Sequence, residues 1–387
     1  MIFMREQNTA GPVSLSFAIL GGVWGAVAGM LPAIKAYVGA SDAMFGQILV
    51  IASIGALCVL LNVERITTWI GPRALYWFAA ALPCFVVFTV LSAQIWVFVC
   101  VLVGFAMMSS GLDVTMNARL AERQIAQKHQ VMNYAHGVYG LSYAAGALYA
   151  GALQEMGLSR LVIAGVLCAV CVFAARRLWS IVPTDHSEAA LDTPPMRHGT
   201  WFIVALGVIG LVSLMTEQAV DLWAGIYIER GLSQRPFFLA LGPAMLGLML
   251  GVGRFAAQRY DHLIAPMPLI VGGGILATFG GSLVSIGPNL GSVYLGFGAM
   301  GLGVSIIFPS LLNIVAQIVP QSRRVWAISR VSALSYAGTF FGPPLVGFVS
   351  EAYTISTAFW VITGVVAMIP LVGVPVVRLL APKADRA

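Results

Sequence analysis

Long apolar runs, separated by short polar segments, extend along the chain from about residue 14 to residue 379. Each run is close to the twenty residues that an α-helix needs to cross the hydrocarbon core of a bilayer. The runs are continuous, which is not the alternating pattern of membrane β-strands. We therefore predict twelve membrane-spanning helices, at 14–34, 43–63, 74–92, 95–118, 132–153, 158–180, 200–226, 236–257, 264–286, 291–316, 326–349 and 354–379.

The basic residues predict how these helices are oriented. Cytoplasmic loops of membrane proteins carry an excess of Lys and Arg. A cytoplasmic N-terminus places seventeen of the 21 Lys and Arg residues at or near the inner side, and leaves Lys35, Arg160, Arg230 and Arg235 outside. Because the number of helices is even, both termini are expected in the cytoplasm, with the chain in the bacterial inner membrane.

One long polar segment, residues 181–199, interrupts the apolar pattern and is interpreted as a flexible cytoplasmic linker. It would separate an N-terminal six-helix bundle (1–180) from a C-terminal six-helix bundle (200–387). The two halves also repeat in sequence. Leu-Ser-Tyr-Ala at 141–144 recurs at 334–337, and the pattern at 101–108 resembles that at 293–300, with nearly the same offset of about half the chain.

Composition supports a polytopic membrane protein and excludes several other classes. Apolar residues make up 59% of the chain and charged residues only 9%, which a soluble domain could not bury. The net charge of +6 is explained by the loops, so no nucleic-acid partner is expected, and the bilayer is the expected surrounding. The five cysteines lie in apolar runs, and no metal-binding, phosphate-binding or nucleophile motif is found. We predict no cofactor, no metal and no enzymatic activity.

Three acids lie inside the predicted helices: Asp113 in the fourth, and Glu217 and Asp221 in the seventh. A charged side chain at the centre of a bilayer costs roughly 2.5–3.5 kcal/mol on insertion scales. These acids must therefore face a cavity, form pairs or carry a proton. Asp113 shares a helix face with Asn117, and Glu217 shares one with Asp221. The predicted topology places the first pair in the inner half and the second in the outer half, as two polar stations at different depths.

The sequence also allows two interpretations in which these acids have a structural role at a helix end. Asp113 could be a helix-end carboxylate held by Arg119 or Arg123, because the fourth apolar run ends nearby. Asp221 could be an interface residue at the outer end of its helix, close to Arg230.

A polar stripe follows one face of the fifth helix, where His136, Tyr139 and Tyr143 are spaced three and four apart. Tyr336 in the eleventh helix is the repeat partner of Tyr143, so a two-fold axis between the halves would place the two tyrosines opposite each other. The alternative is that these are interface aromatics or helix-to-helix hydrogen bonds.

Glycines predict where helices pack closely. The first helix carries Gly21, Gly25 and Gly29, and the eleventh carries Gly338, Gly342 and Gly347 around two prolines. Small residues let helix backbones approach each other in a membrane. At the inner end of the eighth helix, Arg254 with Arg259 and Asp261 is expected to form a charge clasp.

The chain resembles transporters of the major facilitator superfamily. Gly111-x-Asp113-x-x-x-Asn117 is similar to the Gly-x-Glu-x-x-x-Asn element of the fucose/proton symporter group, where the acid is implicated in proton coupling, and Trp24-Gly25 also matches that group. Uncharacterised bacterial transporters related to that group provide a further resemblance, carried by Leu31-Pro32-Ala-Ile-Lys35, Ser41-Asp42, Asp113…Asn117…Glu122, His136, Glu217…Asp221-Trp223…Tyr227 and Gly342-Pro343-Pro344.

This chain departs from those families at two places. The first helix lacks the acid of the fucose symporters. The superfamily has a Gly-x-x-x-Asp-Arg-x-Gly motif in the loop after the second helix. This chain matches it only at Glu64-Arg65, with Gly71-Pro72-Arg73 at a shifted position. Both departures concern residues that the families use for substrate or gating, so fucose is not the expected substrate.

The resemblance implies an all-α membrane protein with two six-helix pseudo-repeats that moves solute by rocking of its halves. We expect a secondary transporter that takes up a small polar organic solute, such as a sugar or related compound, together with protons; a monomer is sufficient for this architecture. The alternatives are a proton-driven exporter of amphipathic compounds and a membrane receptor without transport. The expected residues are Asp113 and Glu217 for protons; Asn117, His136, Tyr139, Tyr143, Asp221, Asn313, Tyr336 and Trp24 for solute; and Arg254, Arg330, Glu64 and Arg65 for gating.

Overall fold

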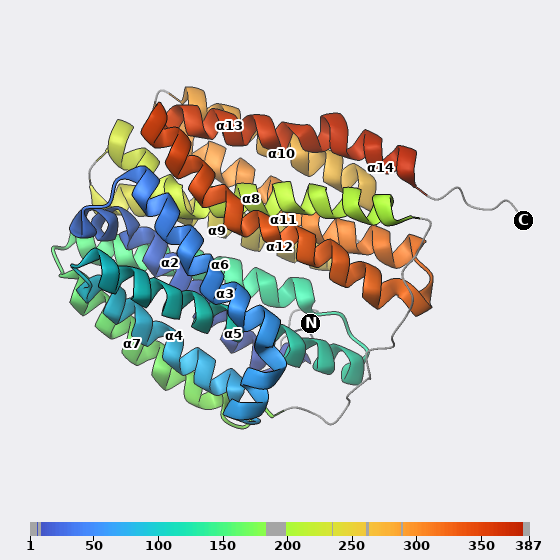
Figure 1. The fold of residues 1–387 in the computed structure, drawn as a ribbon, viewed down its shortest axis with the longest axis horizontal. Helices are drawn as coiled ribbons and strands as arrows, with labels where there is room; N and C mark the ends of the chain where they lie inside the picture. Colours follow the sequence, from blue (N-terminus) through green and yellow to red (C-terminus); the bar gives the residue numbers. More distant parts are fainter. Residues whose placement is uncertain are drawn as a thin grey trace, which may run out of the picture.

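The computed structural model describes residue 6 and residues 9–182, 199–233, 235–260, 263–287 and 289–381, and the regular structure in these ranges is all helical. The predicted all-α fold is confirmed, and each predicted span coincides with a helix (Figure 1). The first six spans are α2 (Val13–Val38), α3 (Asp42–Ile70), α4 (Ala74–Leu91), α5 (Ile95–Gln127), α6 (Met132–Glu155) and α7 (Arg160–Ala175), which continues into η1 (Arg176–Leu178). The last six are α8 (Thr200–Gly231), α9 (Pro236–Tyr260), α10 (Pro266–Ile286), α11 (Leu290–Ile318), α12 (Gln321–Ala352), and α13 (Ile355–Met368) with η2 (Ile369–Gly373) and α14 (Val374–Leu380).

Among the described residues, ten helical segments are long and apolar enough to cross a membrane. The two remaining long helices, α6 and α12, fall short of that hydropathy because they carry the polar positions singled out above. Helix ends also differ from the predicted spans, since α5 continues from residue 118 to Gln127 and α12 begins at Gln321. Hydropathy marks only the apolar part of a helix, whereas backbone hydrogen bonds continue into the polar ends.

The helices pack mainly within each half of the chain. In the first half α2 packs on α6, α3 on α5, and α4 on both α5 and α7. In the second half α8 packs on α12, and α11 on both α9 and α10. Contacts between the halves are made chiefly by α6 with α9 and by α3 with α12. Most of the predicted linker, residues 183–198, lies outside the described residues, and the exact division into two bundles stays a prediction.

Glycines allow the closest of these contacts, as predicted. A Cβ atom added to Gly25 of α2 would lie 1.9 Å from the carbonyl oxygen of Tyr143 in α6. A Cβ added to Gly342 of α12 would lie 2.2 Å from the carbonyl oxygen of Met215 in α8. The two helix pairs occupy equivalent places in the repeat, so each half holds its polar helix, α6 or α12, against a neighbour in the same way.

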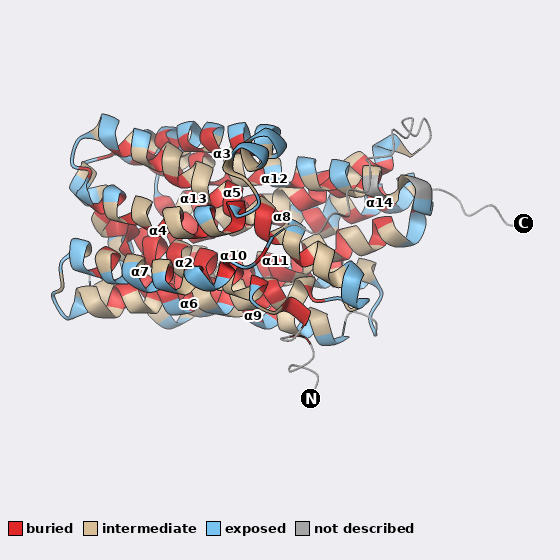
Figure 2. Cartoon of the chain, turned by 90° about the horizontal axis from the view of Figure 1, so that it is seen from below, coloured by how far each residue is buried: buried red, intermediate tan, exposed pale blue. Residues whose placement is uncertain are grey.

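Two ends of the molecule can be defined by the chain itself. At the terminal end lie the start of α2, the start of α8 and the end of α14. At the distal end α2 leads into α3, α6 into α7, and α12 into α13. Buried positions follow the inward faces of the helices between these ends, and exposed positions lie mostly on the outer faces and in the loops (Figure 2).

Candidate functional site

Asp113 and Asn117 form the first part of a polar group between the halves. The Nδ2 atom of Asn117 donates to Oδ1 of Asp113 at 3.0 Å and to its carbonyl oxygen at 2.8 Å. Because α5 continues to Gln127, Asp113 lies about 21 Å from the end of its helix. Arg119 pairs with Glu122 of the same helix instead. The interpretation of Asp113 as a helix-end carboxylate held by Arg119 or Arg123 is therefore wrong, because Asp113 lies well inside α5.

A hydrogen bond between the halves forms the second part. The hydroxyl of Tyr143, on α6, donates to Oδ1 of Asp221, on α8, and both residues are buried. The amide of Gln218 lies 3.5 Å from the other carboxylate oxygen of Asp221. Asp221 is about 15 Å from the end of α8 at Gly231. The alternative that placed Asp221 at the helix end beside Arg230 is wrong. The sequence predicted that Tyr143 lies opposite Tyr336, whereas the partner of the Tyr143 hydroxyl in the structure is Asp221.

Glu217 and Arg254 are opposite charges that are close without being bonded. They lie near enough to attract each other electrostatically, from α8 and α9. No ion pair joins them among the described residues, and the Oε2 atom of Glu217 is buried there without a hydrogen-bond partner. A buried carboxylate oxygen without a partner is unfavourable.

Two further tyrosines connect these parts into one group. Tyr336 is 39% exposed although it lies about 22 Å from the start of α12, and its electrostatic neighbours are Asp113, Glu217 and Arg254. It therefore faces the space between the halves. Tyr139 interacts with Asp113, Glu217 and Asp221 alike. The sequence had suggested two stations at different depths; the structure instead brings Asp113, Glu217 and Asp221 around shared neighbours, which we call the central group.

The remaining predicted solute-binding residues lie at the edge of the central group or apart from it. His136 stacks edge-on against Phe17, with ring centroids 5.2 Å apart, and is an electrostatic neighbour of Arg254. Trp24 donates to the hydroxyl of Ser109 at 2.8 Å, which ties α2 to α5. Asn313 is half-buried on α11, and the contacts of the described residues do not connect it with the central group.

The four predicted gating residues do not gather in one place. Arg254 belongs with Glu217 and Tyr336 in the central group. Glu64 and Arg65 are exposed towards the end of α3, and Arg330 is exposed near the start of α12, 5.9 Å from the ring of Trp326. Asp261, the acid of the expected clasp with Arg254, lies outside the described residues.

Sequence reasoning missed a cluster at the distal end, where Asp42 of α3 meets Lys35, Arg230 and Ser350. The only signal was indirect, since Lys35 and Asp42 stood in the pattern shared with bacterial transporters. Nothing in the sequence connects them with residues near position 350.

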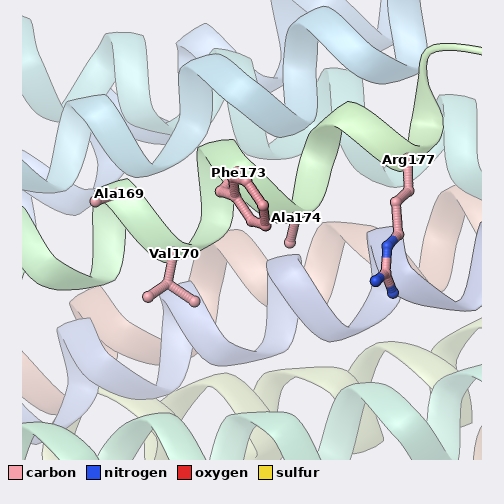
Figure 3. Close-up of a pocket in the computed structure, with 5 residues that line it drawn as sticks. All are labelled: Ala169, Val170, Phe173, Ala174 and Arg177. Carbon is pink, nitrogen blue, oxygen red and sulfur yellow. The ribbon is translucent and has the colours of Figure 1, made fainter.

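An open hollow of about 430 Å³ lies elsewhere, on α7 and η1 (Figure 3). Its lining residues are Ala169, Val170, Phe173, Ala174 and Arg177. Val170 and Phe173 are largely exposed and apolar, as expected for a helix face that meets lipid. The hollow is therefore a feature of the outer surface and not part of the central group.

The fold is that of a multi-pass membrane protein with a polar group between its halves. The chain belongs to the Major Facilitator Superfamily, whose profile matches residues 13–324 and 268–387. It is a transporter and not an enzyme.

Relatives and solved structures agree with this family. An uncharacterized transporter of the same type from Yersinia pestis is 23% identical over 89% of this chain and 90% of its own length. The membrane protein MosC of Rhizobium meliloti is 24% identical over 93% of this chain and 88% of its own. The nucleoside transporter NupG has the same fold, with a TM-score of 0.70 at 11% identity, covering 95% of this chain and 99% of its own. A bacterial homolog of the human lysosomal transporter Spinster, solved in an inward-facing and occupied conformation, gives a TM-score of 0.66 at 14% identity, over 97% and 96% of the two chains. These matches do not confirm the resemblance to the fucose/proton symporters.

Proposed function

We propose that this transporter takes up a small polar organic solute, such as a sugar or related compound, together with protons. It would lie in the bacterial cytoplasmic membrane with both termini inside, so that the terminal end faces the cytoplasm. The observation that carries the proposal is the hydrogen bond from Tyr143 to Asp221 between the halves, with two further acids nearby.

The chemistry of this bond supports a link between protonation and motion. An ionised carboxylate can only accept hydrogen bonds, whereas a protonated one can also donate. Gain or loss of a proton at Asp221 therefore changes which bonds can join α6 to α8. Alternating access requires contacts between the halves to break and form again in each cycle, so a proton in this place alters the balance between conformations.

Asp113 is proposed as a second proton site, with Asn117 donating to its charged form. Burial disfavours the charged form of a carboxyl, so a neutral Asp113 makes reorientation of the carrier easier. Moving one charge through 100 mV is worth about 2.3 kcal/mol, which a proton can deliver to solute uptake. Glu217 and Arg254 offer the solute one acceptor and one donor, with Asn117, Tyr139 and Tyr336 around them and His136, Trp24 and Asn313 further out.

The test is transport in proteoliposomes with a pH-sensitive dye inside. Neutral sugars, polyols, monocarboxylates and amines are first screened for a rise in the melting temperature of the purified protein, because a ligand of the folded state stabilises it. The compound that binds is then added outside. We expect acidification of the lumen with the native protein, and a loss of about 100-fold or more with Asp113→Asn, equivalent to about 2.7 kcal/mol.

Two controls make this result specific. Asp113→Asn is expected to keep solute counterflow, which needs no net proton movement, and Glu155→Gln, which neutralises an acid far from the central group, is expected to behave as the native protein. Full proton-driven uptake by Asp113→Asn contradicts the assignment of Asp113. Solute flux without acidification in the native protein contradicts proton coupling, and accumulation only in inverted vesicles supports export.

A further inference from the structure

A cluster of charges at the distal end joins four helices. Asp42, the first residue of α3, is 3% exposed. Its carboxylate accepts hydrogen bonds from both terminal nitrogens of Arg230 on α8 and from the hydroxyl of Ser350 on α12. Lys35 of α2 is 3.0 Å from the same carboxylate. Two of these partners belong to the opposite half of the chain, so Asp42 holds the halves together.

The start of α3 is also capped from the opposite half. The first N–H groups of a helix have no partner within the helix, and a side chain just before it usually accepts one of them. Ser41 does so for Met44, at 3.3 Å. The Oε2 atom of Glu351, at the end of α12, accepts the N–H groups of Asp42 at 2.9 Å and Ala43 at 3.3 Å. A carboxylate at a helix N-terminus is favoured by the helix dipole as well.

The helix backbones meet beside this cluster without intervening side chains. A Cβ on Gly347 of α12 would lie 2.6 Å from the carbonyl oxygen of Asp42, and one on Gly46 of α3 would lie 3.2 Å from the Cα of Pro344. The gap between α3 and α12 is therefore closed at this end by backbone packing as well as by charge.

At the terminal end, α5 and the start of α12 are not packed together in the described part of the chain. Within the same described residues, α5 makes no extensive contact with α11 either. By contrast, α6 and α9 are joined at both ends. Glu155 pairs with Arg235 distally, and Gln258 bonds to the backbone of Tyr134 and Gln130 at the terminal end. The α6–α9 contact joins the halves at both ends and thus resembles a hinge. The Asp42 cluster joins them at the distal end and resembles a latch.

We propose that Asp42, Arg230, Ser350 and Glu351 form a distal latch that holds the transporter closed at that end while the central group opens towards the terminal end. This proposal rests on the alternating access that the proposed function requires.

The latch can open without leaving any of its charged side chains without a partner of opposite charge. Lys35 and Asp42 belong to the same half and stay together when the halves separate. Arg230 and Glu351 both belong to the other half, and both now contact Asp42, so Arg230 can turn to Glu351 once Asp42 leaves. An ion pair left on each side avoids the uncompensated charge that makes breaking a buried pair costly. When the latch opens, Arg230 therefore exchanges Asp42 for Glu351, and Asp42 keeps Lys35.

The test is hydrogen exchange of the whole purified protein, followed by mass spectrometry, without solute and without a proton gradient. Asp42→Asn is expected to raise exchange about tenfold or more in peptides from residues 40–50 and 344–352, equivalent to about 1.4 kcal/mol. At the same time exchange should fall in peptides from residues 118–127 and 321–330, because the terminal end closes when the distal end opens. The opposite change in the two sets of peptides identifies a switch, because a loss of stability alone raises exchange in both sets alike.

Matched variants keep the test decisive. Glu155→Gln removes a charge pair between the halves at the same end, in the α6–α9 contact, and is expected to change neither set of peptides. Ser350→Ala removes the hydroxyl that donates to Asp42 and leaves Lys35, Arg230 and Glu351 in place, so it should show a smaller reciprocal change, even if Asp42→Asn folds poorly. Asp42→Glu keeps the carboxylate and should stay near the native pattern. Equal increases in both sets of peptides, or no change in Asp42→Asn and Ser350→Ala, overturn the latch. Because no transport is measured, this result is independent of whether protons drive uptake.

Discussion

The central group and the distal latch are both clusters of charge between the halves, but they differ in how completely their charges are paired. In the latch, Asp42 is bonded by Arg230, Lys35 and Ser350. In the central group, Glu217 keeps a buried oxygen without a partner in the described part of the chain, although Arg254 is near. Charges that satisfy one another hold a conformation, whereas charges left partly unsatisfied are available to protons and ligands.

The difference has a physical basis. An unpaired charge inside a membrane protein costs free energy and persists where function needs it. A buried pair costs little once its hydrogen bonds are made, but its loss is costly. Substitutions in the two clusters should therefore separate activity from stability.

The largest expected effect concerns the bond between Tyr143 and Asp221. Tyr143→Phe and Asp221→Asn should each lower proton-driven uptake by about 100-fold, or about 2.7 kcal/mol. The melting temperature should fall less than in Asp42→Asn, because one interaction between the halves is lost and not several. The double variant should be no worse than the poorer single one, because both remove one interaction. Tyr149→Phe is the control, since Tyr149 bonds to the carbonyl of Ile163 within the first half. If uptake stays normal and the melting temperature falls, the bond between Tyr143 and Asp221 stabilises the fold, as the latch does, and is not required for transport.

The next effect concerns the stability of the latch. Asp42→Asn should lower the free energy of unfolding by about 1.5–3 kcal/mol, the range for hydrogen bonds to charged groups. Thermal unfolding in detergent, followed by fluorescence, measures this change. Asp42→Glu should recover most of the loss. A melting temperature that is unchanged in Asp42→Asn would mean that the charges at the distal end are not the source of its closure.

The smallest effect on stability concerns Glu217. Glu217→Gln removes a carboxylate with one buried oxygen that has no hydrogen-bond partner among the described residues, but it also removes a negative charge near Arg254. The two effects oppose each other, so stability should change by less than about 1 kcal/mol while uptake falls. The same unfolding assay, beside transport, measures both quantities. A clear loss of stability in Glu217→Gln would indicate that Glu217 is paired as fully as Asp42, and the contrast between the clusters would fail.

The sequence determined the helices and part of the site. Twenty-residue apolar runs predicted the positions of the spans, because crossing a bilayer is a matter of local length and composition. Glycines at 25 and 342 predicted close packing, which the structure confirms. Asp113 and Asn117, four residues apart, were expected on one face and are bonded there. Orientation and the residues' roles in transport stay predictions.

Only the tertiary structure decided which polar residues meet. Tyr143 and Asp221 belong to different halves, and hydropathy could not show that they would bond. Glu351 caps a helix that begins 309 positions earlier in the chain, a contact that no local pattern encodes. Helix formation depends on neighbours along the chain, whereas the pairing of charges depends on how the finished helices are packed. For this reason the sequence located the acids, and the fold decided which were paired and which were left partly unsatisfied.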